Sequence, residues 1–223
     1  LKVVSSDDSR ASQIWDAPTK LLAVKPQQLG DVVSTLPKEH FSFSARRSLL
    51  VSLLAGVRLR RLQEAFAGYA CVRAVPNTPA MVRAGLTGLS WGDGVTEDQR
   101  LLVRELFLPI SEVFEFPEKQ LDPFLALTSS GPAYLAVIIE ALADGAVASG
   151  LPRALAFQLA NEMVAGSSTL LKEKRLHPAE LKDMVTSPGG TTIAALRHLE
   201  LAGIRSALIE AVVLATKRSQ ELA

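Results

Sequence analysis

The sequence predicts an α/β fold followed by an all-α fold in a chain of 223 residues. In the first half, short apolar runs alternate with stretches of helical periodicity, which is the pattern of a sheet with crossover helices. Several of these runs are continuously apolar, as in the buried strands of a parallel sheet. After Pro117 no further strand pattern follows, and helical periodicity continues to the end of the chain.

Chain breakers and capping residues set the limits of the elements in the first half. Pro26 and Gly56 close two apolar runs, and Thr96 precedes two acidic residues in the first turn of a helix. Strands are expected at 1–4, 21–24, 48–54, 70–75, 86–91 and 113–116. Helices are expected in a short stretch that ends at Trp15 and at 27–36, 58–66 and 96–107.

Glycine and proline divide the second half into helices. Gly131 and Pro132 interrupt the apolar pattern, Gly150 stands where the residue after a helix end is expected, and Gly203 ends a further helix. We expect helices at 120–127, 134–149, 152–174, 177–185, 191–202 and 204–222. The change of pattern predicts two domains, residues 1–117 and 118–223.

Composition and charge narrow the classes of function. The formal net charge is +1, so no broad charged field favours nucleic acid as a partner. The apolar run 135–143 contains Glu140 and is too short to span a bilayer. Cys71 is the single cysteine, which excludes an intrachain disulfide and favours a reducing, cytoplasmic location. The histidines show no metal-ligand spacing with Cys71, so we predict no metal site.

Three successive predicted strands end in small, polar or Pro-rich turns, at 23–26, 54–56 and 75–78. In an open parallel sheet, ligands bind beyond the carboxyl ends of the strands. The three turns together therefore predict a ligand site at one edge of the sheet. Each turn taken singly also fits a plain connection between a strand and a helix.

A polar, glycine-rich segment at 182–193 lies between two helical stretches. Pro188 fixes its own φ, and two glycines follow it. The N–H groups and hydroxyls of Thr191 and Thr192 then stand at the start of a helix, where anions bind. The same pattern fits an ordinary helix connection in which one threonine caps the second helix.

The helix expected at 134–149 is apolar on nearly all sides, so neighbours must bury it all round. A partner subunit would supply such neighbours. A central position within the bundle of one chain is the alternative.

Six segments of the sequence match, in order, the motifs of one enzyme family and extend over nearly the whole chain. The most specific is 184–193, with Leu199, Glu200, Gly203, Arg205 and Ser206 after it. The others are 23–26, 75–80, 128–134, 140–145 and 150–152. On these segments the chain resembles pyrroline-5-carboxylate reductase.

The resemblance implies that the first domain is a partial Rossmann-like parallel sheet that binds NADPH, or NADH. It implies that the second is a helical domain for substrate binding and dimerisation, in a homodimer or a ring of dimers. Lys25 would lend positive charge to the cofactor, although it also fits a solvated lysine at a strand end. Asp8 stands where the family commonly has asparagine, and its charge would repel a 2′-phosphate. The implied cofactor-binding residues are Asp8, Ala23, Val24, Lys25, Pro26, Ala55, Gly56, Asn77 and Thr78.

The sequence departs from the family at its beginning. It contains no G-x-G-x-x-G or G-x-G-x-x-A, the fingerprint that cradles a pyrophosphate. Residues 1–8 resemble the family's third strand and the turn after it, and the chain does not begin with Met. We therefore expect a preceding β-α-β-α unit of roughly 40–60 residues in a longer protein.

The implied reaction is the reduction of 1-pyrroline-5-carboxylate to L-proline by hydride transfer to the C=N carbon. Thr192 is the implied catalytic residue, near the ring nitrogen, as an orienting hydrogen-bond donor or a proton donor. Ser130 would line the pocket from the helical domain, or cap the helix that follows. The implied substrate-binding residues are Ser187, Gly189, Gly190, Thr191, Thr192 and Ser130.

Two other classes of function are open at this stage. One is a non-catalytic helical dimer or scaffold that has lost its nucleotide-binding half. The other is a related reductase for a different imine or hydroxyacid. The intact segment 187–192 argues against both, because a scaffold does not need it and it is specific to the reductase family.

Overall fold

The computed structural model describes residues 15–36 and 48–222. Two compact units are formed, the first by the described residues up to Ser130 and from Val212 on, the second by Gly131–Ala211. The predicted strand at 1–4, the helix before Trp15 and the cofactor residue Asp8 lie outside the described residues. The domain limit between residues 117 and 118 stays a prediction.

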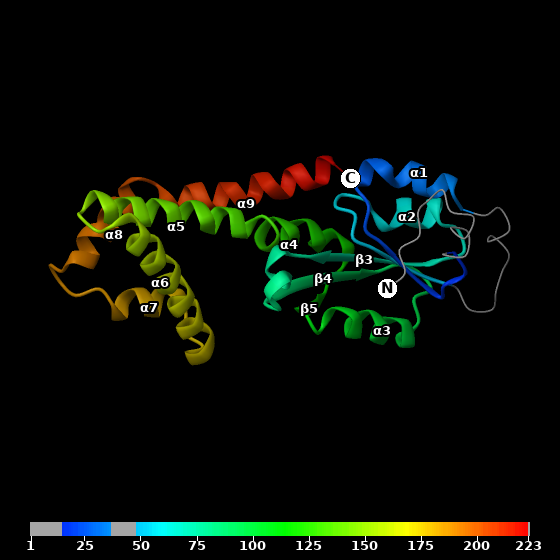
Figure 1. Ribbon diagram of the computed structural model, residues 1–223, viewed down its shortest axis with the longest axis horizontal. Helices are drawn as coiled ribbons and strands as arrows, with labels where there is room; N and C mark the ends of the chain where they lie inside the picture. Colours follow the sequence, from blue (N-terminus) through cyan, green and yellow to red (C-terminus); the bar gives the residue numbers. More distant parts are fainter. Residues whose placement is uncertain (1–14, 37–47, 223) are drawn as a thin grey trace. The chain divides into compact units, whose positions relative to one another are not determined.

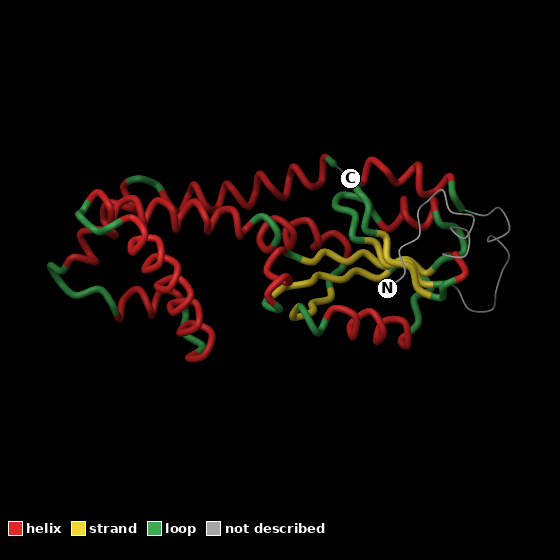
Figure 2. Tube along the Cα trace, viewed as in Figure 1, coloured by secondary structure: helices red, strands yellow, loops and turns green. Residues whose placement is uncertain are grey.

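A five-stranded sheet, in the order β1-β2-β3-β4-β5, forms the centre of the first unit within the described residues (Figures 1 and 2). The first three strands are parallel, β4 is antiparallel to β3, and β5 is parallel to β4. The prediction of a mostly parallel sheet is therefore confirmed. The strands are β1 (Thr19–Leu22), β2 (Leu49–Ser52), β3 (Ala70–Pro76), β4 (Gly85–Trp91) and β5 (Ser111–Glu115).

Helices cover both faces of this sheet, which explains its continuous apolar runs. On one face, Leu50 and Cys71 pack with Leu62 and Phe66 in and beside helix α2 (Leu59–Ala65). The opposite face packs on α3 (Glu97–Phe107) through Val103 and Phe107, with strand residues Leu49, Val51, Ala70, Val72, Ala74 and Leu89. Helix α1 (Leu29–Ser34) lies on the side of α2 (Figure 1).

The start of α3 confirms the reading of Thr96 as a cap. The Thr96 hydroxyl accepts a hydrogen bond of 3.3 Å from the backbone N–H of Gln99, and the Gln99 side chain accepts one from Thr96 N–H. This capping box satisfies donors that the helix leaves unpaired. Glu97 and Asp98 in the first turn add favourable interactions with the helix dipole.

The helices expected after Pro117 are present. A single 3₁₀ turn, η5 (Glu118–Gln120), leads into α4 (Leu121–Thr128), and both belong to the first unit. Two further 3₁₀ turns, η2 (Pro26–Gln28) and η4 (Thr78–Val82), follow β1 and β3. The remaining helices are α5 (Gly131–Ala148), α6 (Arg153–Lys174), α7 (Pro178–Met184), α8 (Thr191–Leu201) and α9 (Ile204–Glu221).

Helix α5 is mostly exposed. It packs on α6 through the small residues Ala143, Ala156 and Ala160, and Ala143 is its one buried residue. Leu135, with an exposed fraction of 42%, and Val137, with 65%, face away from the chain. The alternative in which this helix is enclosed by the bundle of one chain is therefore wrong.

The argument that the apolar run 135–143 is too short to span a bilayer considered only part of a longer helical stretch. Among the described residues, one helical stretch, Glu118–Ala148, is long and apolar enough to cross a membrane by length and composition alone. The apolar run is short, but the helix that contains it is not.

Candidate active site

The three predicted cofactor turns lie at one edge of the sheet. They follow the carboxyl ends of β1, β2 and β3, which are parallel neighbours in register. Because parallel strands end at the same edge, residues 23–26, 55–56 and 77–78 are brought to one side of the first unit.

The first turn presents backbone and one positive charge. Lys25 is exposed and extended, with φ −69° and ψ 146°, and Pro26 begins the turn η2. The Lys25 N–H donates to the side-chain oxygen of Gln28 at 3.1 Å, which ties the turn closed. Ala23 is exposed and Val24 is half-buried, so small side chains line the approach.

The second turn depends on glycine. Gly56 has φ +74°, a left-handed conformation that other residues adopt at a cost. A Cβ at this position would lie 3.0 Å from the carbonyl oxygen of Leu222, so the end of the chain packs directly on this turn. Ala55 beside it is exposed.

Asn77 holds the third turn through both ends of its side-chain amide. Its Oδ1 accepts a hydrogen bond of 2.8 Å from the N–H of Leu86, and its Nδ2 donates one of 3.0 Å to the carbonyl of Thr128. The hydroxyl of Ser129 lies 3.5 Å from the carbonyl of Pro76. The half-buried Ser130 is thereby held near the carboxyl end of β3. Thr78, which follows Asn77 in the sequence, is exposed.

The glycine-rich turn between α7 and α8 belongs to the second unit. Gly189 has φ +68°, so the chain reverses in a conformation that favours glycine. The N–H of Gly190 donates to the carbonyl of Ser187 at 3.1 Å. A Cβ at Gly190 would lie 2.4 Å from the Ser187 hydroxyl oxygen, so the turn is too tight for any other residue to fit without movement.

The start of α8 has free hydrogen-bond donors. Gly190 is the N-cap, and no side chain caps the helix, so the alternative in which Thr191 or Thr192 serves as the cap is wrong. Ala194 is the first residue whose N–H bonds within the helix, to the Gly190 carbonyl at 3.4 Å. The N–H groups of Thr191, Thr192 and Ile193 are therefore left for an anion, beside the half-buried Thr192 side chain.

One polar cluster escaped the sequence analysis. Arg73, in the middle of β3, is buried and donates to the Glu118 carboxylate at 2.8 Å. The same oxygen accepts a hydrogen bond of 2.6 Å from the N–H of Leu59, at the start of α2. Glu118 therefore joins a strand, a helix start and the turn before α4. The available signal was a charged residue inside the apolar run 70–75.

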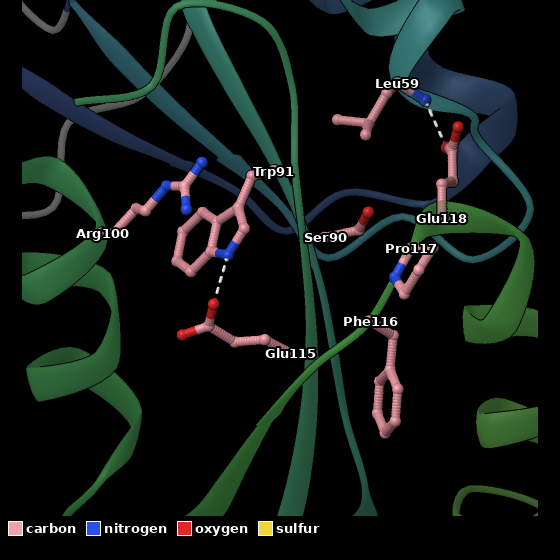
Figure 3. Close-up of a pocket in the computed structure, with 8 residues that line it drawn as sticks. All are labelled: Leu59, Ser90, Trp91, Arg100, Glu115, Phe116, Pro117 and Glu118. Carbon is pink, nitrogen blue, oxygen red and sulfur yellow. Dashed lines mark hydrogen bonds between the residues drawn. The ribbon is translucent and has the colours of Figure 1, made fainter. Parts of the chain in front are cut away.

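A cavity of about 430 Å³ opens where β5 leaves the edge of the sheet (Figure 3). The indole of Trp91 donates to Glu115 at 2.7 Å, and Arg100 lies over the indole ring at 5.4 Å. Arg104 binds the other oxygen of Glu115 at 2.5 Å and holds the pKa of that carboxyl below its ordinary value. None of the predicted site residues that the structure describes lines this cavity.

Metal chemistry is not indicated by the described ranges. Within residues 15–36 and 48–222 there is no group of three or more His, Cys, Asp or Glu side chains arranged to hold an ion.

Comparison with known proteins shows the relationship of the chain. Residues 118–222 match the family model described as pyrroline-5-carboxylate reductase dimerisation. The pyrroline-5-carboxylate reductase of Synechocystis is 48% identical over 219 residues, which are 98% of this chain and 79% of that protein.

Solved structures agree. A pyrroline-5-carboxylate reductase from Coxiella burnetii superposes with a TM-score of 0.85 at 35% identity and covers 98% of this chain and 80% of its own. The Plasmodium falciparum pyrroline carboxylate reductase with NADP bound gives a TM-score of 0.84 at 29% identity over 92% of this chain and 77% of its own. The chain belongs to the pyrroline-5-carboxylate reductase family.

Proposed function

We propose that this chain reduces 1-pyrroline-5-carboxylate to L-proline with NADPH or NADH. The observation that carries the proposal is the start of α8, where Gly190 forces a tight turn and leaves N–H groups beside Thr192. A carboxylate needs such donors, and the substrate carries one carboxylate. The family relationship supplies the reaction class.

The carboxyl edge of β1, β2 and β3 fits the cofactor. The exposed Ala23 and Ala55 and the extended Lys25 leave backbone accessible and add one positive charge. Gly56, with its positive φ, shapes the second turn but is itself buried against Leu222. We assign the cofactor contacts to Ala23, Val24, Lys25, Pro26, Ala55, Gly56 and Thr78. The side-chain amide of Asn77 is not among them, because both of its ends are bonded to the protein. When bound, NADPH or NADH supplies the hydride.

The chain's own residues orient the substrate. The N–H groups of Gly189 and Thr191 are assigned to the carboxylate, with the Ser187 hydroxyl beside them. The N–H of Gly190 does not serve as a third donor, because it donates to the Ser187 carbonyl at 3.1 Å. Thr192 hydrogen-bonds the ring nitrogen, and the nitrogen gains a proton as the C=N carbon gains the hydride. A neutral hydroxyl is a weak acid, so Thr192 serves mainly to orient the ring, and water delivers the proton. We also assign a substrate contact to Ser130.

Substitution of Thr192 tests these roles. We expect Thr192→Val to lower kcat/KM for pyrroline-5-carboxylate by about 10²-fold, because the ring nitrogen loses its hydrogen bond. Thr192→Ser keeps the hydroxyl and retains most activity. The dissociation constant of NADPH is measured in parallel and stays unchanged. Full activity of Thr192→Val, with L-proline as the product, refutes the role of Thr192.

The assembly is a homodimer formed through the helices of residues 118–222, in agreement with the matched dimerisation family. The exposed apolar residues of α5, among them Leu135, Val137 and Leu142, need a cover of this kind. We propose that a second copy of the chain, and not lipid, covers these residues. We also propose that dimers associate further into a ring. A cytoplasmic location is a separate proposal. Mass measurement in solution without detergent tests whether a second copy covers these residues: a detergent-dependent monomer contradicts it.

A further inference from the structure

We propose that Asn77 is a positioning residue for the reduction, and that its side-chain amide fixes the turn from Thr128 to Ser130 against the carboxyl end of β3. The resemblance to the reductase family implies that Asn77 contacts the cofactor. In the structure, both polar ends of its side chain are already engaged with the protein. The inference rests on the proposed function, because it concerns where Ser130 stands in that site.

The acceptor end of Asn77 continues the sheet beyond its last regular pair. The register pairs Pro76 with Thr87, and the N–H of Leu86 then lies past the end of β3. The Asn77 Oδ1 takes that N–H at 2.8 Å, in the position where a further strand residue would have supplied a carbonyl. The start of β4 is thus tied to the turn that follows β3.

The donor end binds a carbonyl that α4 cannot satisfy itself. Thr128 is the last residue of α4, and the final carbonyls of a helix have no partner within it. The Asn77 Nδ2 donates to this carbonyl at 3.0 Å. The amide is the side chain of this size that donates at one end and accepts at the other, so aspartate and leucine cannot replace it.

Apolar packing holds the middle of α4 on the sheet, and the hydrogen bond from Asn77 holds its carboxyl-terminal end. The ring of Phe124 lies so close to β4 that a Cβ at Gly88 would be 2.8 Å from it. The ring of Phe124 also packs against that of Phe116 in a tilted arrangement, with ring centroids 5.2 Å apart and an interplanar angle of 44°. These contacts hold the middle of the helix on the sheet. The N–H groups of Ser129 and Ser130 close the turn on the Leu125 carbonyl, at 2.9 and 3.2 Å. The Asn77 bond and the 3.5 Å contact between Ser129 and Pro76 tie this turn to the end of β3.

Two variants separate the two ends of the amide. Asn77→Asp keeps an acceptor for Leu86 N–H and turns the donor into a second acceptor that faces the Thr128 carbonyl. Asn77→Ala removes both bonds. Gln220→Glu is the matched control, because it changes an exposed amide to a carboxylate in the same unit.

Kinetics of the full chain test whether the two hydrogen bonds of the Asn77 side chain contribute to the reaction. We expect both Asn77 variants to lower kcat/KM for pyrroline-5-carboxylate by about tenfold, and Gln220→Glu to leave it unchanged. The dissociation constant of NADPH should stay within about twofold of the parent in all three. A tenfold weaker NADPH affinity with unchanged KM for the substrate overturns the proposal, because it makes Asn77 a direct cofactor ligand.

Hydrogen exchange tests, independently of activity, whether Asn77 holds the turn from Thr128 to Ser130. We expect faster amide exchange at residues 129–131 in both variants, whereas the Leu86 amide loses protection only in Asn77→Ala. Unchanged exchange at residues 129–131 would contradict the proposal that Asn77 fixes this turn, even if activity falls. If the parent chain forms no proline, the proposed function fails, and the exchange result still decides whether Asn77 holds the turn.

Discussion

Ser219 near the end of α9 donates a hydrogen bond of 2.8 Å to Asp122 at the start of α4, and both side chains are buried. The two residues are 97 positions apart in the sequence. This bond ties the last turns of the chain to the helix that follows the sheet. It accounts for the grouping of Val212 and later residues with the first compact unit.

Removal of the Ser219 hydroxyl should destabilise the first unit. Ser219→Ala leaves a buried carboxylate without this donor, so we expect the free energy of unfolding in urea to fall by about 1–3 kcal/mol. Ser149→Ala is the control, because the Ser149 hydroxyl is exposed and bonds the Gly145 carbonyl of its own helix at 2.9 Å. Equal stability of the two variants would show that the buried bond contributes nothing.

The buried pair of Arg73 and Glu118 should matter more than an exposed pair of similar length. Arg73→Met leaves Glu118 with only the Leu59 N–H, and we expect a loss of about 2–4 kcal/mol, reduced from the fully buried case because Glu118 remains partly hydrated. Arg60→Ala breaks an exposed pair with Glu64, which is joined at 2.9 Å against 2.8 Å for the buried pair, and should cost less than about 1 kcal/mol.

Chemical denaturation of the two arginine variants side by side gives the comparison. The slope of the transition must remain the same, since a changed slope would mean that the unfolded or native state had altered. If Arg73→Met costs no more than Arg60→Ala, the buried pair does not hold α2 and η5 on the sheet.

Gly190 offers a test of the tight turn at the substrate site. Its φ of −78° suits alanine, but the added methyl would lie 2.4 Å from the Ser187 hydroxyl and 3.2 Å from the Ser187 carbonyl. The Ser187 hydroxyl must rotate away and the Ser187 carbonyl must shift slightly, so the groups that face the substrate move. We therefore expect Gly190→Ala to lower kcat/KM for pyrroline-5-carboxylate by about 10-fold.

The control for this variant is Gly30→Ala on α1, where nothing lies within 4 Å of an added Cβ. It should leave activity unchanged and raise stability slightly, because alanine favours the helix. NADPH binding is expected to survive in both variants. Parent-like kinetics of Gly190→Ala would mean that the backbone of this turn does not hold the substrate.

Local pattern was enough to place most elements. The capping box at Thr96, the glycine at 150 with φ +107°, and the apolar runs of β2 and β3 each depend on neighbours a few residues away. Such signals are visible in the sequence. The turns after β1, β2 and β3 could likewise be placed at one edge, because parallel strands share their direction.

Partners distant in the sequence could not be predicted in this way. Arg73 and Glu118 are 45 residues apart, and Asn77 and Thr128 are 51 apart. The antiparallel position of β4 depends on a reversal through η4 and the left-handed Arg83, φ +58°, for which no glycine gave a signal. The apolar residues of α5 indicate that other groups must pack on this helix, but the sequence pattern does not identify those groups.

Burial gives Cys71 a distinct chemistry. It has an exposed fraction of 0%, and burial raises the pKa of its thiol to about 12. We expect no reaction with a disulfide reagent in the folded protein and one thiol per chain after unfolding in urea. A folded thiol that reacts as fast as free cysteine would contradict its buried position.

The same shift in pKa predicts the pH dependence of stability. The folded pKa lies above the unfolded value of about 8.5, so the unfolded chain loses its proton first as pH rises. The contribution to stability is complete below about pH 8.5 and falls towards pH 12 by up to about 1.4 kcal/mol per unit. Cys71→Ala should remove this part of the slope.

The most direct test is the formation of L-proline from pyrroline-5-carboxylate and NADPH by the purified protein, with NADPH consumption followed in the same sample. We expect one proline for each NADPH oxidised, no oxidation without substrate, and a large loss in Thr192→Val. A dimer that binds NADPH and pyrroline-5-carboxylate and forms no proline would contradict the assignment of this chain as a reductase.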